Sequence, residues 1–406
     1  MTIGVDAARL IGRLKELGAT GRDEAGRLCR LAATDADREG RDLLCNWLRK
    51  AGLRIEIDRI GNIHGIWEPE GAAGDPVIMG SHIDTVIDAG IYDGCYGVLS
   101  GLAVIEAMQQ AGLRPSRPLA VVAYTNEEGV RYAPDMMGSL VAVGGLSADE
   151  ALAIVGTDGT TLGAELGRIG YVGSREPGFL KPHAYVELHI EQGPILEAEG
   201  RPIGAVENLQ GISWQKITIG GTANHAGTTP MAMRRDAGVA AGRVLVFLDQ
   251  LARNTEGAVA TVGTIRFEPN AINVIPSAAT FTVDLRNPDE VLLQGQETAL
   301  DAFLDGLRNE GFEVKAERLA RFQPVIFEPE IVAAIEASAA ERQLVCRRMT
   351  SGAGHDAQMI ARIAPSAMIF VPSKGGISHN PAEFTADSDL VAGANILLDV
   401  ARKLSQ

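Results

Sequence analysis

The stretch GSHIDTVIDAGIYDGCYGVLSGLAVIEAM, residues 80–108, decides the fold. It continues an apolar run at residues 77–81 that is typical of a buried strand, and it leads into a helical pattern at residues 97–111. A buried strand followed by a helix is the building unit of an α/β sheet. Open α/β sheets bind ligands where their strands end, and this connection carries His82, Asp84 and Asp93.

The same alternation of strand and helix continues along the chain. Helical patterns cover roughly residues 24–52 and 329–343, and the apolar runs at 118–125, 184–190 (AYVELHI) and 367–373 (AMIFVPS) predict further buried strands. A long segment separates the last two runs. We therefore expect one sheet built from both ends of the chain and interrupted by an insertion.

The intervening segment has a different pattern. WQKITIGG, which begins at Trp214, alternates apolar and polar residues, and a helical stretch follows at roughly 235–253. Alternation returns in AVATVGTIRF (258–267) and ATFTVDLR (279–286), before a further helix. Strands on one side and helices on the other predict a small α+β sandwich.

The length of 406 residues also favours two domains, because a single core rarely grows to this size. We predict a catalytic α/β domain formed by residues 1–213 and 327–406, and an inserted domain at residues 214–326.

Composition excludes several classes of function. A net charge of −15 disfavours a nucleic-acid partner, which requires a basic face. Apolar stretches are broken well before 18 residues, so no membrane span is expected, and the N-terminus has no signal-peptide core. The cysteines are far apart and form no CxxC pair, which predicts reduced thiols and a cytoplasmic location. They are Cys29, Cys45, Cys95 and Cys346.

Histidines and carboxylates gather just beyond the apolar runs. The histidines are His82, His189 and His379, and the carboxylates are Asp84, Asp93, Glu127 and Glu128. A single histidine near a strand end is usually structural, but the combination is the ligand set that zinc, manganese or cobalt accepts. Two adjacent glutamates repel each other in a dry pocket, unless one binds a cation while the other holds a proton.

The motifs resemble those of a known family. GSHIDTVIDAGIYDGCYGVLSGLAVIEAM, NEEG, HIEQGPILE, NHAGTTPM, NVIP, SGAGHDAQ and ISHNPAEFT extend in order from residue 80 to 385. They look like the hydantoinase/carbamoylase branch of the di-zinc aminopeptidase-like amidohydrolases, whose members include N-carbamoyl-L-amino-acid hydrolases, β-ureidopropionases and allantoate amidohydrolases. The resemblance implies a di-zinc aminopeptidase-like α/β catalytic domain with an inserted α+β sandwich that acts as a dimerisation and lid domain.

The resemblance also implies a binuclear metal site. Asp93 would bridge two divalent cations, with His82 and His189 completing one site and Glu128 and His379 the other. Zinc is the expected metal, and manganese, cobalt and nickel are alternatives.

Two further carboxylates have implied catalytic roles. Glu127 would be the general base that takes a proton from the attacking water. Asp84 would orient a ligand imidazole, and its alternative interpretation is a turn residue.

Substrate contacts are implied in both domains. Gln192, Gly354 and His355 match positions that line the substrate pocket in relatives, although His355 is also interpretable as a structural cap. His225, Asn273 and Arg286 match residues that reach the active site of the partner subunit, which implies a homodimer. A guanidinium fits a carboxylate bidentately, so Arg286 indicates an acidic substrate. Without the resemblance, a surface ion pair is the simpler interpretation of Arg286.

Together these features predict an amidohydrolase that cleaves the carbamoyl C–N bond of N-carbamoyl-L-amino acids or related ureido acids, releasing amino acid, CO₂ and NH₃. An allantoate amidohydrolase or a β-ureidopropionase is the first alternative, and a di-zinc peptidase of the same fold is the second. A non-catalytic binding module is disfavoured because Glu127 and all five ligands are present. The motifs of serine hydrolases, P-loop proteins and dinucleotide-binding enzymes are absent from the sequence.

Overall fold

The computed structural model describes residues 3–406, which divide into two compact units. Unit 1 comprises the chain up to Glu207 together with Phe327–Gln406, and unit 2 comprises Asn208–Ile326. The second unit begins at Asn208 rather than at Trp214, because Trp214 lies inside a ten-residue strand, Gly211–Gly220. Among residues 3–406, no helix has the length and apolar character that a membrane crossing requires.

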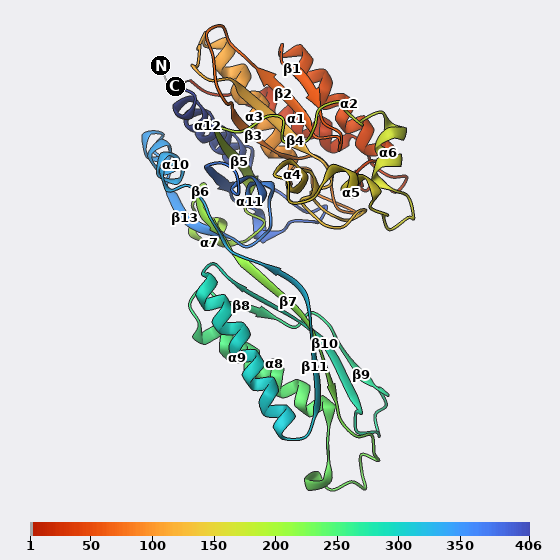
Figure 1. The fold of residues 1–406 in the computed structure, drawn as a ribbon. Coiled ribbons are helices and arrows are strands. Elements are labelled where there is room, and N and C mark those ends of the chain that lie inside the picture. Colours follow the sequence, from red (N-terminus) through yellow and green to blue (C-terminus); the bar gives the residue numbers. More distant parts are fainter. Residues whose placement is uncertain (1–2) are drawn as a thin grey trace. The chain divides into compact units, whose positions relative to one another are not determined.

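Unit 1 is built on a mixed sheet with strand order β1-β2-β4-β3-β5-β14-β6, and β13 also pairs with β6 (Figure 1). The four central strands, β4, β3, β5 and β14, are mutually parallel, whereas β1, β2 and β6 pair antiparallel with their neighbours. The strands are β1 (Arg54–Ile57), β2 (Ile63–Trp67), β3 (Val77–His82), β4 (Leu119–Tyr124), β5 (Ala184–Ile190), β6 (Ile203–Leu209), β13 (Cys346–Ser351) and β14 (Ser366–Val371).

Helices pack against this sheet because they carry apolar residues toward it. α3 contacts β3, β4 and β5, while α12 contacts β5 and β14, and both helices also contact each other. Nearly every residue of α3 is buried, and its small residues allow close packing on the strands. The helices of unit 1 are α1 (Ala7–Ala19), α2 (Asp35–Lys50), α3 (Cys95–Gln110), α4 (Met137–Ala142), α5 (Ala148–Ala153), α6 (Leu162–Ile169), α7 (Ile195–Glu199), α10 (Pro329–Glu341), α11 (Asp356–Ile360) and α12 (Asp387–Leu404), with a 3₁₀ turn η2 (Lys374–Gly376).

One predicted helix is shorter than expected. The pattern at 24–52 suggested a single helix, but residues 24–34 form turns and α2 begins at Asp35. The side chain of Thr34 accepts a hydrogen bond from the Asp37 amide, which caps the helix, and Asp35 and Asp37 complement its positive N-terminal end. The local cap therefore overrides the longer amphipathic pattern.

Unit 2 is an antiparallel five-stranded sheet that packs against two helices. The sheet order is β11-β7-β10-β8, with β9 also paired to β10, and α8 and α9 contact the sheet and each other (Figure 1). Its elements are β7 (Gly211–Gly220), η1 (Met231–Met233), α8 (Ala237–Asn254), β8 (Val259–Thr261), β9 (Ile265–Glu268), β10 (Ala278–Asn287), α9 (Glu290–Asn309), β11 (Glu313–Phe322) and β12 (Val325–Ile326). β12 pairs with Asn208 and Leu209, the two residues of β6 that belong to unit 2.

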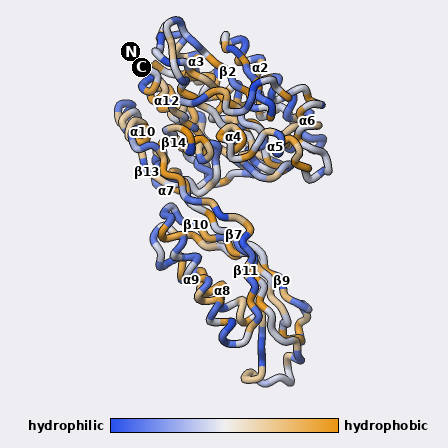
Figure 2. The backbone as a smooth tube through the Cα atoms, in the orientation of Figure 1, coloured by the Kyte–Doolittle hydropathy of each residue, from blue (hydrophilic) through white to orange (hydrophobic). Residues whose placement is uncertain are grey.

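Burial alternates along the strands of unit 2, as the sequence pattern predicts. β7 and β10 bury every second residue, and the buried side chains join those of α8 and α9 in a separate hydrophobic core. Figure 2 shows hydrophobic and hydrophilic residues interleaved along these elements. β11 was not predicted, and the run at 258–267 forms two short strands rather than one. The predicted α/β and α+β layers are both present.

Candidate active site

Four parallel strands bring the candidate site together. His82 is the last residue of β3, Glu127 and Glu128 follow β4, His189 lies near the end of β5, and His379 lies in the connection from β14 to α12. The carboxyl ends of parallel strands lie at one edge of a sheet, so residues distant in sequence meet there. A cavity of about 150 Å³ is lined at this edge by His82, Asp93, Glu127, Glu128, Asp135, Gln192, Ala353, Gly354, His355 and His379.

The first group of possible metal ligands is buried. His82, Asp93 and His189 offer ligand atoms that all lie within 4.8 Å of one another. The Nε2 atoms of His189 and His82 lie 3.1 Å and 3.6 Å from Asp93 Oδ1. Each Nδ1–H donates to a backbone carbonyl, that of Asp84 for His82 (2.9 Å) and that of Ile190 for His189 (2.8 Å). These bonds fix the tautomers and turn both Nε2 atoms toward Asp93.

The second group shares Asp93 and is more open. Asp93, Glu128 and His379 also offer atoms within 4.8 Å of one another. His379 Nε2 lies 3.2 Å from Asp93 Oδ2 and 3.5 Å from Glu128 Oε2, and the His379 side chain is 51% exposed. The two oxygens of Asp93 thus face different groups, Oδ1 the buried pair of histidines and Oδ2 His379. A third, buried group consists of Glu187, His189 and His355.

The donor chemistry of the two groups that share Asp93 fits divalent cations. Imidazole nitrogens and carboxylate oxygens are what zinc and similar metals bind. Burial raises the pKa of Glu128 to about 8, and the nearby Asp93 carboxylate contributes to this rise. The Asp93 hydrogen bond raises the pKa of His379 to about 9. Carboxylates that crowd one another in a dry pocket are stabilised in their charged form by a cation.

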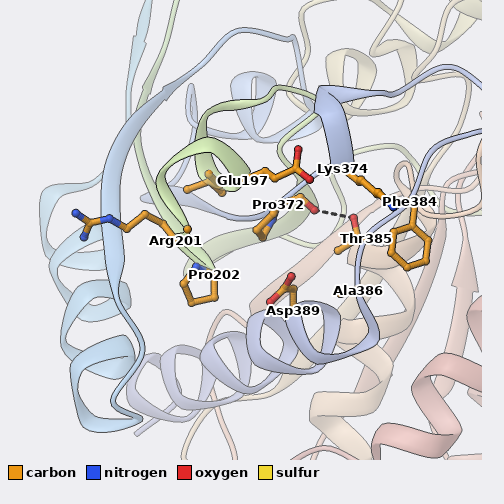
Figure 3. A pocket seen from close by; sticks show the side chains of 11 residues that line it. Glu197, Arg201, Pro202, Pro372, Lys374, Phe384, Thr385, Ala386 and Asp389 are labelled. Carbon is orange, nitrogen blue, oxygen red and sulfur yellow. Dashed lines mark hydrogen bonds between the residues drawn. The ribbon is translucent and has the colours of Figure 1, made fainter.

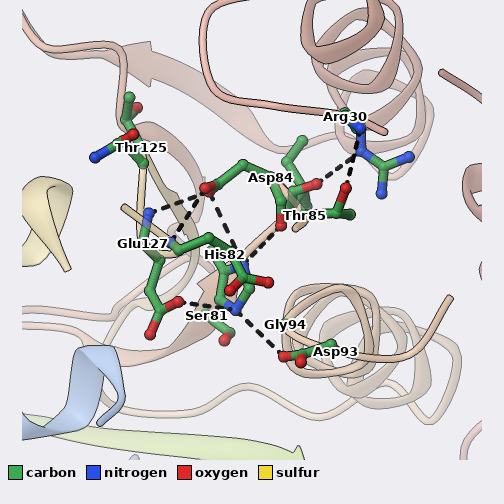
Figure 4. Close-up of polar contacts among 12 residues, drawn as sticks. Arg30, Ser81, His82, Asp84, Thr85, Asp93, Gly94, Thr125 and Glu127 are labelled. Carbon is green, nitrogen blue, oxygen red and sulfur yellow. Dashed lines mark hydrogen bonds and ion pairs between the residues drawn. The ribbon is translucent and has the colours of Figure 1, made fainter. Parts of the chain in front are cut away.

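Glu127 is the remaining buried carboxylate of the pocket (Figure 4). Its Oε2 lies 3.4 Å from His82 Nε2, and burial raises the pKa of Glu127 well above its ordinary value. The Asp84 carboxylate accepts the backbone N–H of Glu127 at Oδ1 and that of Glu128 at Oδ2, both at 3.2 Å. The Asp84 carboxylate therefore holds the backbone of the two glutamates in place. His82 Nδ1 is bonded by the backbone carbonyl of Asp84, because the Asp84 carboxylate oxygen Oδ1 is 3.9 Å away from that nitrogen.

Several residues in and next to the site have positive backbone φ angles. Gly94 has φ +63°, and a Cβ there would fall 2.4 Å from the His82 ring, so only glycine fits beside that imidazole. Asn126, Gln192 and His379 adopt left-handed φ of 56°, 56° and 54°. Such conformations cost about 1–3 kcal/mol for non-glycine residues and cluster at functional sites.

Three of the predicted substrate-binding residues line this cavity. Gln192 donates from Nε2 to Asp93 Oδ2 at 2.8 Å. His355 is buried, its ring centroid lies 4.5 Å from that of His189, and burial lowers the pKa of His355. A neutral imidazole whose buried Nε2 has no hydrogen-bond partner is available to a ligand. Gly354 lies beside it in the cavity wall.

The other three predicted residues belong to unit 2. His225 and Asn273 are exposed and adjacent, since the Ala226 amide donates to the Asn273 carbonyl at 2.9 Å. Arg286 lies in β10 and forms an ion pair with Asp284 at 2.9 Å.

Several residues around the site were not singled out from the sequence. Asp135 and Ala353 line the cavity, and Ser378 and Glu383 contact the groups around Asp93. Ser378 and Glu383 are both part of the ISHNPAEFT motif, so the motif carried the signal, although the residue types alone gave them no role.

An α/β sheet that presents two histidine–carboxylate groups and a further buried glutamate at its strand ends has the arrangement of a metal-dependent hydrolase. Residues 78–403 match the profile of peptidase family M20/M25/M40. The chain belongs to this family, in its hydantoinase/carbamoylase branch, so the predicted family is confirmed.

The relatives place the chain within the branch. An N-carbamoyl-L-amino-acid amidohydrolase of Rhizobium meliloti is 40% identical over 395 residues, covering 97% of this chain and 95% of that enzyme. An allantoate amidohydrolase of Bacillus subtilis is 35% identical, covering 87% of each chain. The crystal structure of a hydantoinase/carbamoylase family amidase from Burkholderia multivorans superposes with a TM-score of 0.96 and 41% identity, covering 100% of this chain and 99% of that one.

Proposed function

We propose that this chain hydrolyses the carbamoyl C–N bond of N-carbamoyl-L-amino acids or related ureido acids, giving the amino acid, CO₂ and NH₃. The observation that carries the proposal is that the two oxygens of Asp93 face two different ligand groups, both beside the buried Glu127. The similarity to amidohydrolases that act on carbamoyl and ureido compounds supports this choice of bond.

The residues would hold two divalent cations, zinc first, with manganese, cobalt or nickel as alternatives. His82, Asp93 and His189 would hold one, and Asp93, Glu128 and His379 the other. Such cations supply Lewis acidity, which polarises a carbonyl and lowers the pKa of water.

The chain's own residues would manage the protons. Glu127 takes the proton of the attacking water at its carboxylate and returns it to the leaving nitrogen, for which a raised pKa is suited. Asp84 keeps Glu127 at the correct place by accepting its backbone N–H. His355 and Gln192 would contact the substrate from the cavity wall.

We also propose that the active enzyme is a homodimer in which unit 2, the dimerisation and lid domain, completes the site. His225, Asn273 and Arg286 would bind the substrate held by the other subunit, with the Arg286 guanidinium paired to a substrate carboxylate. Support comes from the exposure of His225 and Asn273 and from the motif positions of all three. A cytoplasmic location remains a prediction from the spacing of the cysteines, which are all free thiols.

An ammonia-release assay across a substrate panel tests the proposal. The panel contains N-carbamoyl-L-amino acids, N-carbamoyl-β-alanine, allantoate and a dipeptide, and dipeptide cleavage is followed by amine release. Turnover of an N-carbamoyl-L-amino acid supports the main proposal, and preference for allantoate or N-carbamoyl-β-alanine supports the first alternative. Cleavage of the dipeptide alone would replace the proposal with a peptidase.

A further inference from the structure

Glu383 lies on the connection between β14 and α12, and it contacts the segment that carries Asp93. We propose that Glu383 is a positioning residue that, through Ser378, sets the orientation of Asp93 and thereby the affinity of the second cation site, Asp93–Glu128–His379. This inference rests on the two-cation site of the proposed function.

Glu383 is buried and fully engaged. It is 6% exposed, its Oε1 accepts the backbone N–H groups of Tyr92 at 2.9 Å and Asp93 at 3.3 Å, and its Oε2 lies 3.0 Å from the Ser378 hydroxyl. A buried carboxylate needs such donors, because an unpaired one is strongly destabilising. These bonds tie the backbone of the bridging aspartate to a distant segment of the chain.

Ser378 extends the connection to one particular oxygen of Asp93. The Ser378 hydroxyl lies 3.1 Å from Asp93 Oδ2 and 3.0 Å from Glu383 Oε2, and its single proton is donated to one of these two carboxylates at a time. Gln192 Nε2 donates to Asp93 Oδ2 at 2.8 Å. This oxygen faces His379, whereas Oδ1 faces His82 and His189. The contacts through Glu383 therefore bear on the second group more directly than on the first.

The fit between the two segments is tight. A Cβ at Gly90 would fall 2.2 to 2.4 Å from atoms of the Glu383 side chain, so the absence of a side chain at Gly90 is what admits Glu383.

Two hydrogen bonds join the beginning and the end of the connection that carries Glu383. Thr385 donates from its hydroxyl to the Pro372 carbonyl at 2.8 Å (Figure 3), and the Lys374 amide donates to the Phe384 carbonyl at 2.9 Å. Glu383 and His379 thus stand on one constrained loop.

The two ligand groups differ in what else holds them. His82 and His189 are 2% and 1% exposed and are fixed by bonds to backbone carbonyls. The His379 side chain is 51% exposed and its bonds are to Gln192 and the carboxylates of the site. The second site therefore depends on its loop, and the Glu383 contacts hold that loop against Asp93.

The test measures cation binding rather than activity. Full-length apo-protein is titrated with Zn²⁺ against a chromophoric chelator, and the Co²⁺ absorption spectrum is recorded for the same samples. Wild type is expected to bind two cations in two steps. Glu383→Ala is expected to lower the affinity for the second cation about 10- to 100-fold, as for other groups that orient metal ligands. The affinity for the first cation should stay unchanged. Ser378→Ala is expected to act in the same direction.

Glu383→Gln provides a conservative variant. Its amide oxygen keeps an acceptor for the Tyr92 and Asp93 N–H groups, so its second step is expected to lie between those of wild type and Glu383→Ala. If Glu383→Ala does not fold, Glu383→Gln and Ser378→Ala together test the positioning role of Glu383.

Asp58→Asn is the matched control. Asp58 is a fully buried carboxylate of the same unit that accepts two backbone N–H groups and one side-chain N–H, from Ile60 and Asn62. Its replacement should lower the melting temperature but leave both cation steps unchanged.

Two results would overturn the inference while leaving the proposed function standing. One is that Glu383→Gln and Ser378→Ala both bind the second cation with the affinity of wild type. The other is an equal weakening of both steps that Asp58→Asn reproduces. Wild type that binds fewer than two cations would instead remove the proposed site, and the inference with it.

Discussion

The two units hold their candidate functional residues in opposite ways. In unit 1, His82, Glu127 and His189 are at most 8% exposed and stand at the ends of strands. In unit 2, His225 and Asn273 lie exposed outside the strands. The sheet and helices of unit 2 enclose a core of their own that contains none of these residues. Under the proposed function, the fold of unit 1 would hold the catalytic groups in place, and the surface of unit 2 would supply the groups that recognise the substrate.

This difference leads to different expectations for substitutions. A change at a buried strand end of unit 1 should affect the chemical step, because the site is held rigidly there. A change at the surface of unit 2 should affect substrate binding while leaving the metals in place. The variants below separate the two effects.

Glu127→Gln should have the largest effect. It removes the carboxylate that accepts and returns the proton, so turnover should fall by at least about two orders of magnitude. Metal content should stay near that of wild type, because Glu127 belongs to neither ligand group. Steady-state kinetics and metal analysis of the same preparation measure both quantities. Unchanged turnover would exclude the assigned role of Glu127.

Arg286→Ala should have the next largest effect, and it should act on binding. Loss of a bidentate guanidinium–carboxylate pair costs about 1.5–3 kcal/mol of binding free energy, which corresponds to roughly a 10- to 150-fold rise in KM. The carboxamide analogue of the substrate is the control, since wild type should already bind it poorly. Equal turnover of acid and carboxamide by wild type would contradict this role.

Mixing the two impaired variants should restore part of the activity measured at a substrate concentration well below KM, where both variants alone are nearly inactive. If Arg286 of the partner subunit completes each site, a heterodimer of Glu127→Gln and Arg286→Ala chains contains one intact site. Random exchange of subunits would then recover roughly a quarter of wild-type turnover, because half of the dimers are mixed. No recovery, with heterodimers demonstrated by mass spectrometry, would place the complete site within one chain.

The sequence predicted the candidate metal ligands better than the residues that position them. Parallel strands end at one edge, so His82, Glu128 and His379 were expected to meet, and the motifs fixed their order along the chain. The Glu383 contacts with Tyr92 and Asp93 join residues about 290 positions apart. Neither periodicity nor local spacing reports such a contact, because it depends on how two loops pack in three dimensions.

Local geometry was also hidden from the sequence. The role of Asp84 depended on which of its oxygens faces which donor, and only the folded loop decides that. β11 was missed because six of its ten residues are exposed, so its pattern lacks the apolar alternation that marks β7 and β10.

Asp356→Asn should have the smallest effect, on stability rather than activity. Asp356 is fully buried, and neither of its carboxylate oxygens accepts a hydrogen bond of good geometry among residues 3–406, although the Ser139 hydroxyl is near enough to favour the charged form. Burial, and then the nearby Glu187, raises the pKa of Asp356 well above its ordinary value. The folded chain therefore binds this proton more tightly than the unfolded chain, and stability falls as the pH rises from about 4 through the folded-state pKa.

The asparagine variant has no such proton to lose, so its advantage in melting temperature over wild type should grow between pH 5 and pH 8. An advantage of about 1 kcal/mol corresponds to roughly 2–4 °C for a unit of this size. Differential scanning calorimetry at both pH values measures it, with Asp58→Asn as a hydrogen-bonded buried carboxylate that should lose stability at both. A difference between Asp356→Asn and wild type that stays constant with pH would show that Asp356 does not titrate in this range, and that the interior of unit 1 tolerates its charge.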